Sequence, residues 1–225
     1  MKISAYFSKK LPKEPRERFL ELEKLGYAPV YTLYQEHGDR VVCLDENYQY
    51  PGLEAFIEEQ AHGDAVVARR PGLYIGVKTA DCVPILLWDE TAGVCAAVHA
   101  GWRGTALGVA CKTAEVMQSR FQAAPGRIQA AIGPCVCQKC FETHRDVPDA
   151  MPDWAGGCIA PLGGEKFLAD LPAINRLWLE RAGVTRVDMP KACTACSPEL
   201  YWSHRRHGAE RGLQVSLIGI IPPGC

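Results

Sequence analysis

Short apolar runs separated by glycine, proline and aspartate dominate the first half of the chain. The run VCAAVH at 94–99 stays apolar up to its histidine, which is typical of a strand covered on both faces. Similar aliphatic and β-branched runs predict further strands. They lie at 30–33, 40–44, 65–68, 74–78 and 84–88. We therefore expect buried strands at the centre of the fold.

Helical periodicity appears in three stretches. Residues 14–26 predict a short helix that ends at a glycine, and residues 105–121 predict one longer helix with a broad apolar face. Residues 167–182 predict another, with Pro172 tolerated in the first turn and Gly183 as its stop. Helices of this kind alternate with the strands and would cover them.

The second half adds strands at 128–132, 184–189 and 214–221. Its Gly/Pro-rich stretch 148–164 is expected to be a loop rather than a domain linker, because neither flank looks self-sufficient. The pattern as a whole favours an α+β fold with one central core, and we expect residues 1–225 to form a single domain.

Composition narrows the functional classes. The 225 residues are 48% hydrophobic and 23% charged, which is typical of a globular protein rather than a disordered one. A formal net charge of −1 argues against a dedicated nucleic-acid binder. No apolar run has the length of a signal peptide or a membrane span. We expect a cytoplasmic protein, monomeric or homodimeric, without nucleic-acid or membrane partners.

Three segments carry residues that bind metals. YQEHGDRV (34–41), VKTADCVPILLWD (77–89) and AAVHAGWRGT (96–105) contain His37, Cys82 and His99 at strand ends or turns. These residues are too far apart in the chain for a local zinc knuckle, but they suit a site assembled from separate elements. Three ligands would leave a fourth position for water or substrate. The alternative is a buried thiol and two unrelated histidines.

The same segments resemble the multicopper polyphenol oxidase (laccase-domain) family, also called the YfiH or DUF152 family. TADCVPILLWD and AAVHAGWRGT resemble its TADC-P and HAGWRG blocks, and QEHGDRV resembles its Q-x-HG-x-x-V block. AAIGPCVCQKCFE, KFLADLPAINRLWLERAGV and CTACSPELYWSHRRHG resemble later blocks. The N-terminal segment departs, because SKKLPKEPRER stands where the family has N-x-G-D.

The resemblance implies a fold and an activity. The fold would be an α/β sandwich with sheets inside and helices outside. The activity would be that of a zinc-dependent purine nucleoside phosphorylase, with adenosine deaminase and methylthioadenosine phosphorylase as further reactions. Its zinc ligands would be His37, Cys82 and His99, with Cu²⁺ as an alternative ion. Purine nucleosides and phosphate would be its small-molecule partners.

Deamination needs an acid/base group beside an activated water. The H-x-E and P-C-x-x-C motifs of the zinc nucleoside deaminases are absent, so a deaminase here would have another design. Asp81 and Glu36 are candidate proton shuttles, with Cys82 and His99 as further catalytic residues. Asp81 would equally serve as a turn or capping residue.

Phosphorolysis needs an anion site. The turn AGWRGT lies between an expected strand and an expected helix, so Arg103 and the backbone at Gly104 are phosphate-binding candidates. The alternative is that the glycines only permit a tight turn. Arg205 and Arg206 in SHRRHG are a second anion candidate, and the alternative there is an exposed basic pair.

Other classes of protein stay open. Cys82 as nucleophile with His99 as base would make a metal-independent cysteine hydrolase, for instance on a cell-wall precursor amide. A copper-loaded polyphenol oxidase would have to use the single His/Cys/His site, because a true laccase needs about ten histidines and the chain has 6. The 11 cysteines also suggest a metal-binding or redox-sensing protein without turnover.

The remaining cysteines include two groups that lie close together in the sequence. Cys135, Cys137 and Cys140 crowd one turn, and Cys193 and Cys196 form a C-x-x-C pair. Together they could form a second, structural zinc site. Metal binding is not part of the family block that contains the pair, and we expect buried thiols instead.

Overall fold

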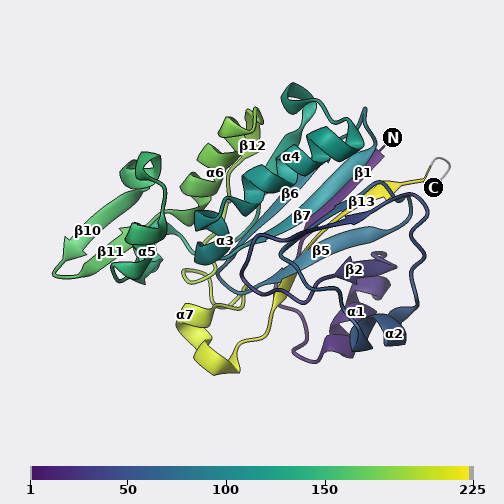
Figure 1. Ribbon diagram of the computed structural model, residues 1–225. Coiled ribbons are helices and arrows are strands. Elements are labelled where there is room, and N and C mark those ends of the chain that lie inside the picture. Colours follow the sequence, from purple (N-terminus) through teal and green to yellow (C-terminus); the bar gives the residue numbers. More distant parts are fainter. Residues whose placement is uncertain (1, 223–225) are drawn as a thin grey trace.

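Two packed sheets form the centre of the molecule (Figure 1). The computed structural model describes residues 2–222. The larger sheet has six strands in the order β12 (Arg186–Asp188), β8 (Gln129–Ile132), β6 (Val83–Asp89), β7 (Val94–Ala100), β4 (Ala65–Ala68) and β3 (Val41–Leu44). It contains most of the strands that the apolar runs predict.

The second sheet joins distant parts of the chain. Its order is β1 (Lys2–Phe7), β13 (Gln214–Ile221), β5 (Tyr74–Thr79) and β2 (Val30–Thr32). Strand β1, which the sequence pattern did not predict, pairs antiparallel with β13 and so places the beginning of the chain beside its end. A third, smaller sheet projects from the body of the molecule (Figure 1); it is formed by β10 (Ile159–Gly163), β11 (Lys166–Ala169) and β9 (Glu142–Thr143).

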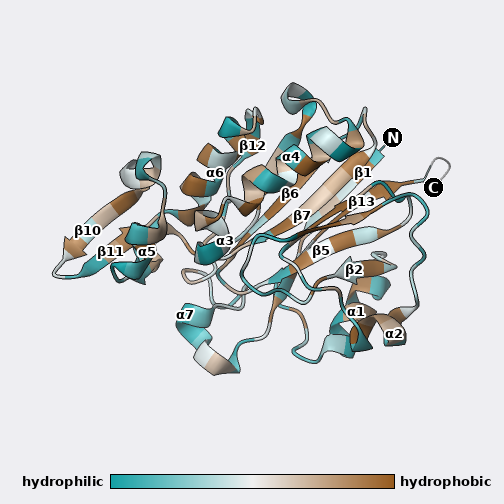
Figure 2. Ribbon diagram, in the orientation of Figure 1, coloured by the Kyte–Doolittle hydropathy of each residue, from teal (hydrophilic) through white to brown (hydrophobic). Residues whose placement is uncertain are grey.

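The central strands of the six-stranded sheet are buried on both faces. In β7, Ala96 and Val98 pack into the core beneath helices α4 (Val109–Phe121) and α6 (Leu171–Arg181). The alternate residues Cys95 and Ala97 pack into the core shared with the four-stranded sheet. This alternation follows from the two-residue period of a strand, and it confirms the expectation for VCAAVH. Figure 2 shows apolar colouring along these central strands.

Two helices near the start of the chain contribute to the core between the sheets. Phe19 of α1 (Pro15–Lys24) packs edge-on against Phe56 of α2 (Leu53–Glu58), with 5.8 Å between ring centroids. Both side chains belong to the core shared by the two sheets. The arrangement is the mixed α/β fold that was expected. Within residues 2–222, no helix combines the length and apolarity required for a bilayer crossing.

The predicted helix over 105–121 is wrong as a single element. The chain forms α3 (Trp102–Ala106) and then α4, with Gly108 between them at a φ of 75°. A Cβ at Gly108 would lie 3.1 Å from the ring of Trp178. The close approach of α6 therefore fixes the break, which apolar periodicity cannot detect.

The expectations for 148–164 and for the start of the next helix also need correction. The first stretch is not a loop, because it contains the end of α5 (Asp146–Ala150), a 3-10 helix η3 (Asp153–Cys158) and β10. Helix α6 begins only after Asp170, whose carboxylate accepts a hydrogen bond from the backbone N–H of Ala173 at 3.0 Å. This N-cap sets the boundary, and the preceding apolar residues belong to strand β11.

The other short elements are η1 (Pro125–Arg127), η2 (Gln138–Cys140), α7 (His204–His207) and η4 (Gly208–Glu210). Helix α7 lies at one end of the sheets, near the start of β6 and the end of β7 (Figure 1).

Candidate active site

His37, Cys82 and His99 come together at one end of the six-stranded sheet. Their ligand atoms all lie within 4.8 Å of one another. Cys82 immediately precedes β6, and His99 lies near the end of β7, where it pairs with Pro84 of β6. Antiparallel pairing therefore brings Cys82 and His99 to the same edge of the sheet.

His37 reaches this edge from the loop between β2 and β3. Its φ of 62° is unusual for a residue with a side chain. The loop is held by the Asp64 carboxylate, which accepts hydrogen bonds from the backbone N–H groups of His37 at 2.9 Å and Gly38 at 2.7 Å. The His37 and His99 rings are 4.9 Å apart and nearly perpendicular. A Cβ at Gly101 would lie 2.9 Å from the His37 ring, so this glycine leaves room for it.

Asp64 also orients His99. Its carboxylate lies 2.7 Å from Nδ1 of His99, and both side chains are buried. An imidazole that donates its Nδ1–H to a carboxylate presents Nε2 as a lone-pair donor. Sequence reasoning missed Asp64. The Gly63–Asp64 pair directly before a buried strand was the available signal, but it does not distinguish this role from a turn.

The local charges favour a reactive thiolate. Burial alone would raise the pKa of Cys82, but the facing His99 and His37 overcome this effect and lower the pKa to about 6. Burial would lower the pKa of His99, but the Cys82 thiolate and Asp64 raise it to about 9. Without a bound ion the pair therefore resembles a thiolate facing an imidazolium.

The donor set fits a zinc or copper ion. Two imidazoles and one thiolate are nitrogen and sulfur ligands that both ions accept. Three protein ligands are typical of catalytic sites, which keep one position open. His37 is exposed and Cys82 half-buried, so the group opens toward solvent on one side, whereas His99 closes it on the other.

A cavity of about 540 Å³ begins at this opening, within the size range of small-molecule sites. A smaller one of about 290 Å³ adjoins it, and both are lined by His37 and Cys82. The wall of the larger cavity also includes the aromatic side chains of Trp102 and Phe141 and the imidazole of His204.

Three arginines line the larger cavity, one from α3 and two from the adjoining α7 and η4 region. The guanidinium of Arg103 lies over the Trp102 ring, 4.2 Å from its centroid. Arg205 lies over Phe141 at 5.2 Å and donates to the backbone carbonyl of Glu142. Arg211 is the third, and sequence reasoning missed it. These side chains give the cavity a positive wall.

Two predicted phosphate-binding residues have other contacts. The Arg206 Nε donates to the Ala195 carbonyl at 2.7 Å, and Arg206 is absent from the cavity lining. A Cβ at Gly104 would lie 2.8 Å from the carbonyl oxygen of Gly38, so this glycine permits close packing of the His37 loop. Helix α3 has 5 residues, so its dipole is small and contributes little to an anion site at the AGWRGT turn.

The candidate proton shuttles are both hydrogen-bonded. Asp81 lines the cavity, but its carboxylate accepts from the hydroxyls of Thr194 at 2.6 Å and Ser203 at 3.0 Å. It also accepts from the backbone N–H of Arg205 at 2.8 Å, which agrees with the capping alternative. Glu36 pairs with the exposed His62 at 2.8 Å.

Lys78 is a further residue that sequence reasoning missed. It lines the smaller cavity, and its Nζ donates to Gln60 at 3.0 Å. Burial, aided by the charge of Arg18, lowers the pKa of Lys78 to about 8. Its position at the end of β5 beside an apolar run gave no sign that the ammonium would be enclosed.

The expectation of buried thiols is wrong for four of the five clustered cysteines. Only Cys135 is fully buried. Cys137, Cys140 and Cys193 are half-buried and Cys196 is exposed, and these four gather in a second group outside the cavity.

Comparison with known proteins places the chain in a family. Residues 10–221 match the family described as multi-copper polyphenol oxidoreductase laccase. An adenosine deaminase from an unknown prokaryotic organism is 38% identical over 79% of this chain and 70% of its own. A purine nucleoside phosphorylase of Deinococcus radiodurans is 36% identical over 87% and 73%.

Solved structures agree on the fold. A Neisseria meningitidis protein of the DUF152 family is 33% identical, with a TM-score of 0.78 over 92% of this chain and 81% of that one. A Bacillus licheniformis YfiH protein superimposes with a TM-score of 0.86 at 23% identity, over 97% and 92%. The matched segment contains every residue of the His/Cys/His group, and the chain belongs to the laccase-domain (YfiH/DUF152) family.

Proposed function

We propose that this chain is a metal-dependent purine nucleoside phosphorylase. The observation that carries the proposal is the meeting of His37, Cys82 and His99 beside a cavity with a positive wall. Relatives that are named purine nucleoside phosphorylase support it. The proposed reaction takes a purine nucleoside and phosphate and yields the free base and ribose 1-phosphate.

His37, Cys82 and His99 would hold the ion, and Zn²⁺ is the ion that we propose. When bound, it supplies a Lewis acid beside the cavity. The chain's own contribution is orientation, because Asp64 fixes both the His99 ring and the His37 loop. Such outer partners of metal ligands are worth 10- to 100-fold in metal affinity, as an order of magnitude.

The arginines would bind and aim the phosphate. Guanidinium groups form bidentate, charge-assisted hydrogen bonds with phosphate oxygens. Arg103 and Arg205 each lie over an aromatic ring, and this cation–π contact favours one placement of the guanidinium. A phosphate oxygen forms the new bond to C1′ of the ribose while the bond from C1′ to the purine nitrogen breaks. The departing base then takes up a proton.

The purine would lie against the apolar part of the wall. Val136, Phe141 and Leu171 line the same cavity as the arginines. A purine has two flat apolar faces, and aromatic side chains bind such faces by stacking. A cavity with one apolar and one cationic side suits a ligand pair of which one member is aromatic and the other anionic.

Adenosine deamination is a second candidate, favoured by the 38% identical relative named adenosine deaminase. It would use the same His/Cys/His group and cavity. Asp81 and Glu36 remain the proposed shuttles, although each already has hydrogen-bond partners. Deamination yields inosine and needs no phosphate, so one assay separates the two reactions.

A metal-independent hydrolase is the competing proposal for these residues. In such an enzyme Cys82 would be the nucleophile, His99 its base and Asp64 the carboxylate that orients the base. The two proposals differ in their response to chelation. A cysteine hydrolase keeps its activity when metal is removed, whereas the phosphorylase loses it and regains it on addition of zinc.

This sequence alone does not supply the ligands of a multicopper oxidase of the laccase type. Four coppers need about ten histidines, and the chain has 6 in total. Among residues 2–222, His37, Cys82 and His99 form the one mixed nitrogen and sulfur group. Any oxidase activity would therefore depend on copper bound to these three residues.

The test incubates zinc-loaded protein with inosine or adenosine, with and without phosphate, and measures products by chromatography. We expect phosphate-dependent release of the free base, lost in Cys82→Ser and retained in the control Cys158→Ser. Cys158 is half-buried and lies outside both ligand groups. Absence of phosphate-dependent base release from the zinc-loaded protein would overturn the phosphorylase proposal, and inosine formed from adenosine without free base would favour deamination instead.

A further inference from the structure

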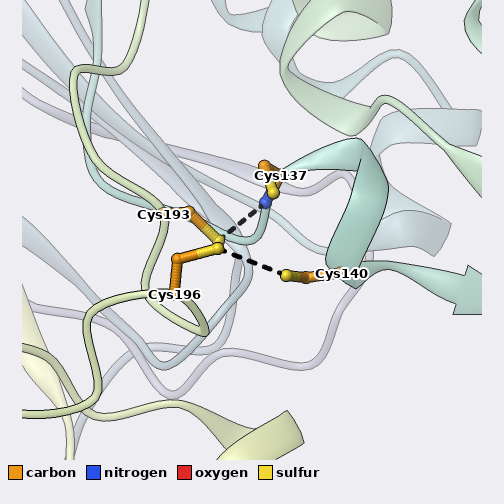
Figure 3. Close-up of side chains that lie close together, drawn as sticks. All are labelled: Cys137, Cys140, Cys193 and Cys196. Carbon is orange, nitrogen blue, oxygen red and sulfur yellow. Dashed lines mark hydrogen bonds between the residues drawn. The ribbon is translucent and has the colours of Figure 1, made fainter.

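Four cysteines form a second cluster that the proposed activity does not use. Cys137 and Cys140 come from the turn containing η2, after β8, and Cys193 and Cys196 come from the loop between β12 and α7. The two pairs are more than fifty residues apart in sequence, yet all four sulfurs point toward one another (Figure 3).

The sulfur positions suit a tetrahedral ion. All four Sγ atoms lie within 4.8 Å of one another, and those of Cys140 and Cys196 are 3.4 Å apart. Zinc–sulfur bonds of about 2.3 Å in a tetrahedron imply sulfur–sulfur distances of about 3.8 Å. The cluster therefore needs adjustments of less than about an ångström to enclose zinc.

The backbone holds the two pairs in place. Cys135 forms a β-bridge with Cys193, and the Thr194 N–H donates to the Cys135 carbonyl at 3.0 Å. The Cys137 N–H donates to the sulfur of Cys193 at 3.2 Å. A backbone N–H directed at sulfur stabilises a thiolate, which is the form that binds metal.

The residue pattern agrees with the geometry. Each pair has the C-x-x-C spacing, which lets one tight turn present two sulfurs to one ion. Two such pairs supply four ligands and leave no open position, which is the arrangement of structural rather than catalytic zinc sites.

We propose that Cys137, Cys140, Cys193 and Cys196 together bind one structural zinc ion, separate from the His37/Cys82/His99 group. The ion joins a loop that lines the cavity to a second loop that supports the cavity wall from behind. Val136 and Phe141, on the first loop, line the cavity. The second loop carries Thr194, whose hydroxyl donates to Asp81 at 2.6 Å. The zinc would thus stiffen the side of the site that the substrate contacts.

The first measurement is the metal content of the full chain, purified under reducing conditions. Elemental analysis of His37→Ala/His99→Ala should still find one zinc per chain, because this variant keeps the four-cysteine cluster. Iron in place of zinc, no metal, or a disulfide between Cys140 and Cys196 in the reduced preparation would overturn the proposal. None of these outcomes depends on whether the chain phosphorolyses nucleosides.

The second measurement assigns the ligands. Cys196 is exposed, so Cys196→Ser removes one ligand with little effect on packing. In the His37→Ala/His99→Ala background, Cys196→Ser should lower the zinc affinity at least about a hundredfold, more than loss of an outer partner does. The control Cys158→Ser should leave it unchanged.

Cobalt substitution gives a readout that does not depend on the cysteine variants folding well. Co²⁺ bound to the His37→Ala/His99→Ala protein should show intense thiolate-to-cobalt absorption from four sulfurs. Weak absorption typical of oxygen and nitrogen ligands would contradict the assignment.

Discussion

A substitution at Asp64 tests how much the orientation of the metal ligands matters, because Asp64 is not itself a ligand. The Asp64 carboxylate uses Oδ1 for His37 and His99 and Oδ2 for Gly38, so the single oxygen of Asp64→Asn can replace only one of these acceptors, and the charge beside His99 is lost. We expect zinc affinity to fall by about 10- to 100-fold, as for other outer-partner substitutions. Competition titration with a chromophoric chelator measures this loss.

Asp89→Asn is the matched control. Asp89 is equally buried and its carboxylate accepts from the backbone N–H groups of Thr91 and Ala92, far from the ligands. This variant should lose stability but keep its zinc affinity. Equal losses of affinity in both variants would mean that Asp64 acts only through general stability.

Lys78 predicts how stability depends on pH. Its pKa is about 8 in the folded chain, below the 10.5 of an ordinary lysine. Between these values the unfolded chain binds more protons, so this residue makes stability rise with pH over that window and costs up to about 3 kcal/mol below it. Lys78→Met should therefore gain stability relative to the wild type at pH 7, and the difference should shrink toward pH 10.

Urea denaturation at pH 7, 8, 9 and 10 measures this difference, because groups common to both proteins cancel. Lys9→Met, at an exposed position, is the control and should show no such trend. A wild-type/Lys78→Met difference that stays constant with pH would contradict the lowered pKa.

Arg205 and Arg206 are adjacent but have different surroundings. Arg205 lines the cavity, whereas Arg206 is bonded to the Ala195 carbonyl. A hydrogen bond to a charged group is worth about 1.5–3 kcal/mol, so Arg205→Met should raise the KM for phosphate by about tenfold or more. Arg206→Met should change it by less than about twofold. Steady-state kinetics with varied phosphate would refute the assignment if the two variants behaved alike.

Among individual residues, the sequence predicts the metal ligands better than the residues that orient them or line the cavity. His37, Cys82 and His99 carry distinctive chemistry and stand in recognisable segments, and the structure brings them together. Asp64 and Arg211 are common residue types in ordinary turns. Their roles depend on which distant loops meet, and a single sequence contains no direct record of that.

The break between α3 and α4 is a testable feature of the elements. Gly108 has a φ of 75° and faces the Trp178 ring, so Gly108→Ala meets both backbone strain and a close contact. Left-handed backbone costs a residue with a Cβ about 1–2 kcal/mol. We expect the free energy of unfolding to fall by at least that amount, as measured by denaturation.

Gly126→Ala is the comparison, because a Cβ there has nothing within 4 Å. It should be neutral or gain up to about 1 kcal/mol through the unfolded chain. If Gly108→Ala were equally harmless, the close approach of α6 to this turn would be wrong.

The strands were predictable because their apolar runs match buried positions. Strands β4 and β13 have the predicted bounds, and β6 and β7 differ by one residue at their ends. Helix boundaries were less accessible. The start of α6 depends on a cap at Asp170, and the preceding apolar residues suit either a strand or a helix. Strand β1 is half exposed, and its pairing with the far end of the chain gives no local signal.

The whole molecule gathers its chemistry at one end of two stacked sheets. Strand ends supply Cys82 and His99, a loop supplies His37, and the later part of the chain supplies the cationic wall. The resemblance to the laccase-domain family predicted this architecture as an α/β sandwich. The four-cysteine cluster departs from the expected burial of these thiols, because two loops that meet only in three dimensions assemble it.

The central claim is that one metal ion sits among His37, Cys82 and His99. Anomalous diffraction at the zinc absorption edge, from crystals of the zinc-loaded protein, tests it directly. We expect a peak at about 2.0–2.3 Å from one nitrogen of each ring and from the Cys82 sulfur. A catalytically active crystal form without density between these three side chains would contradict it.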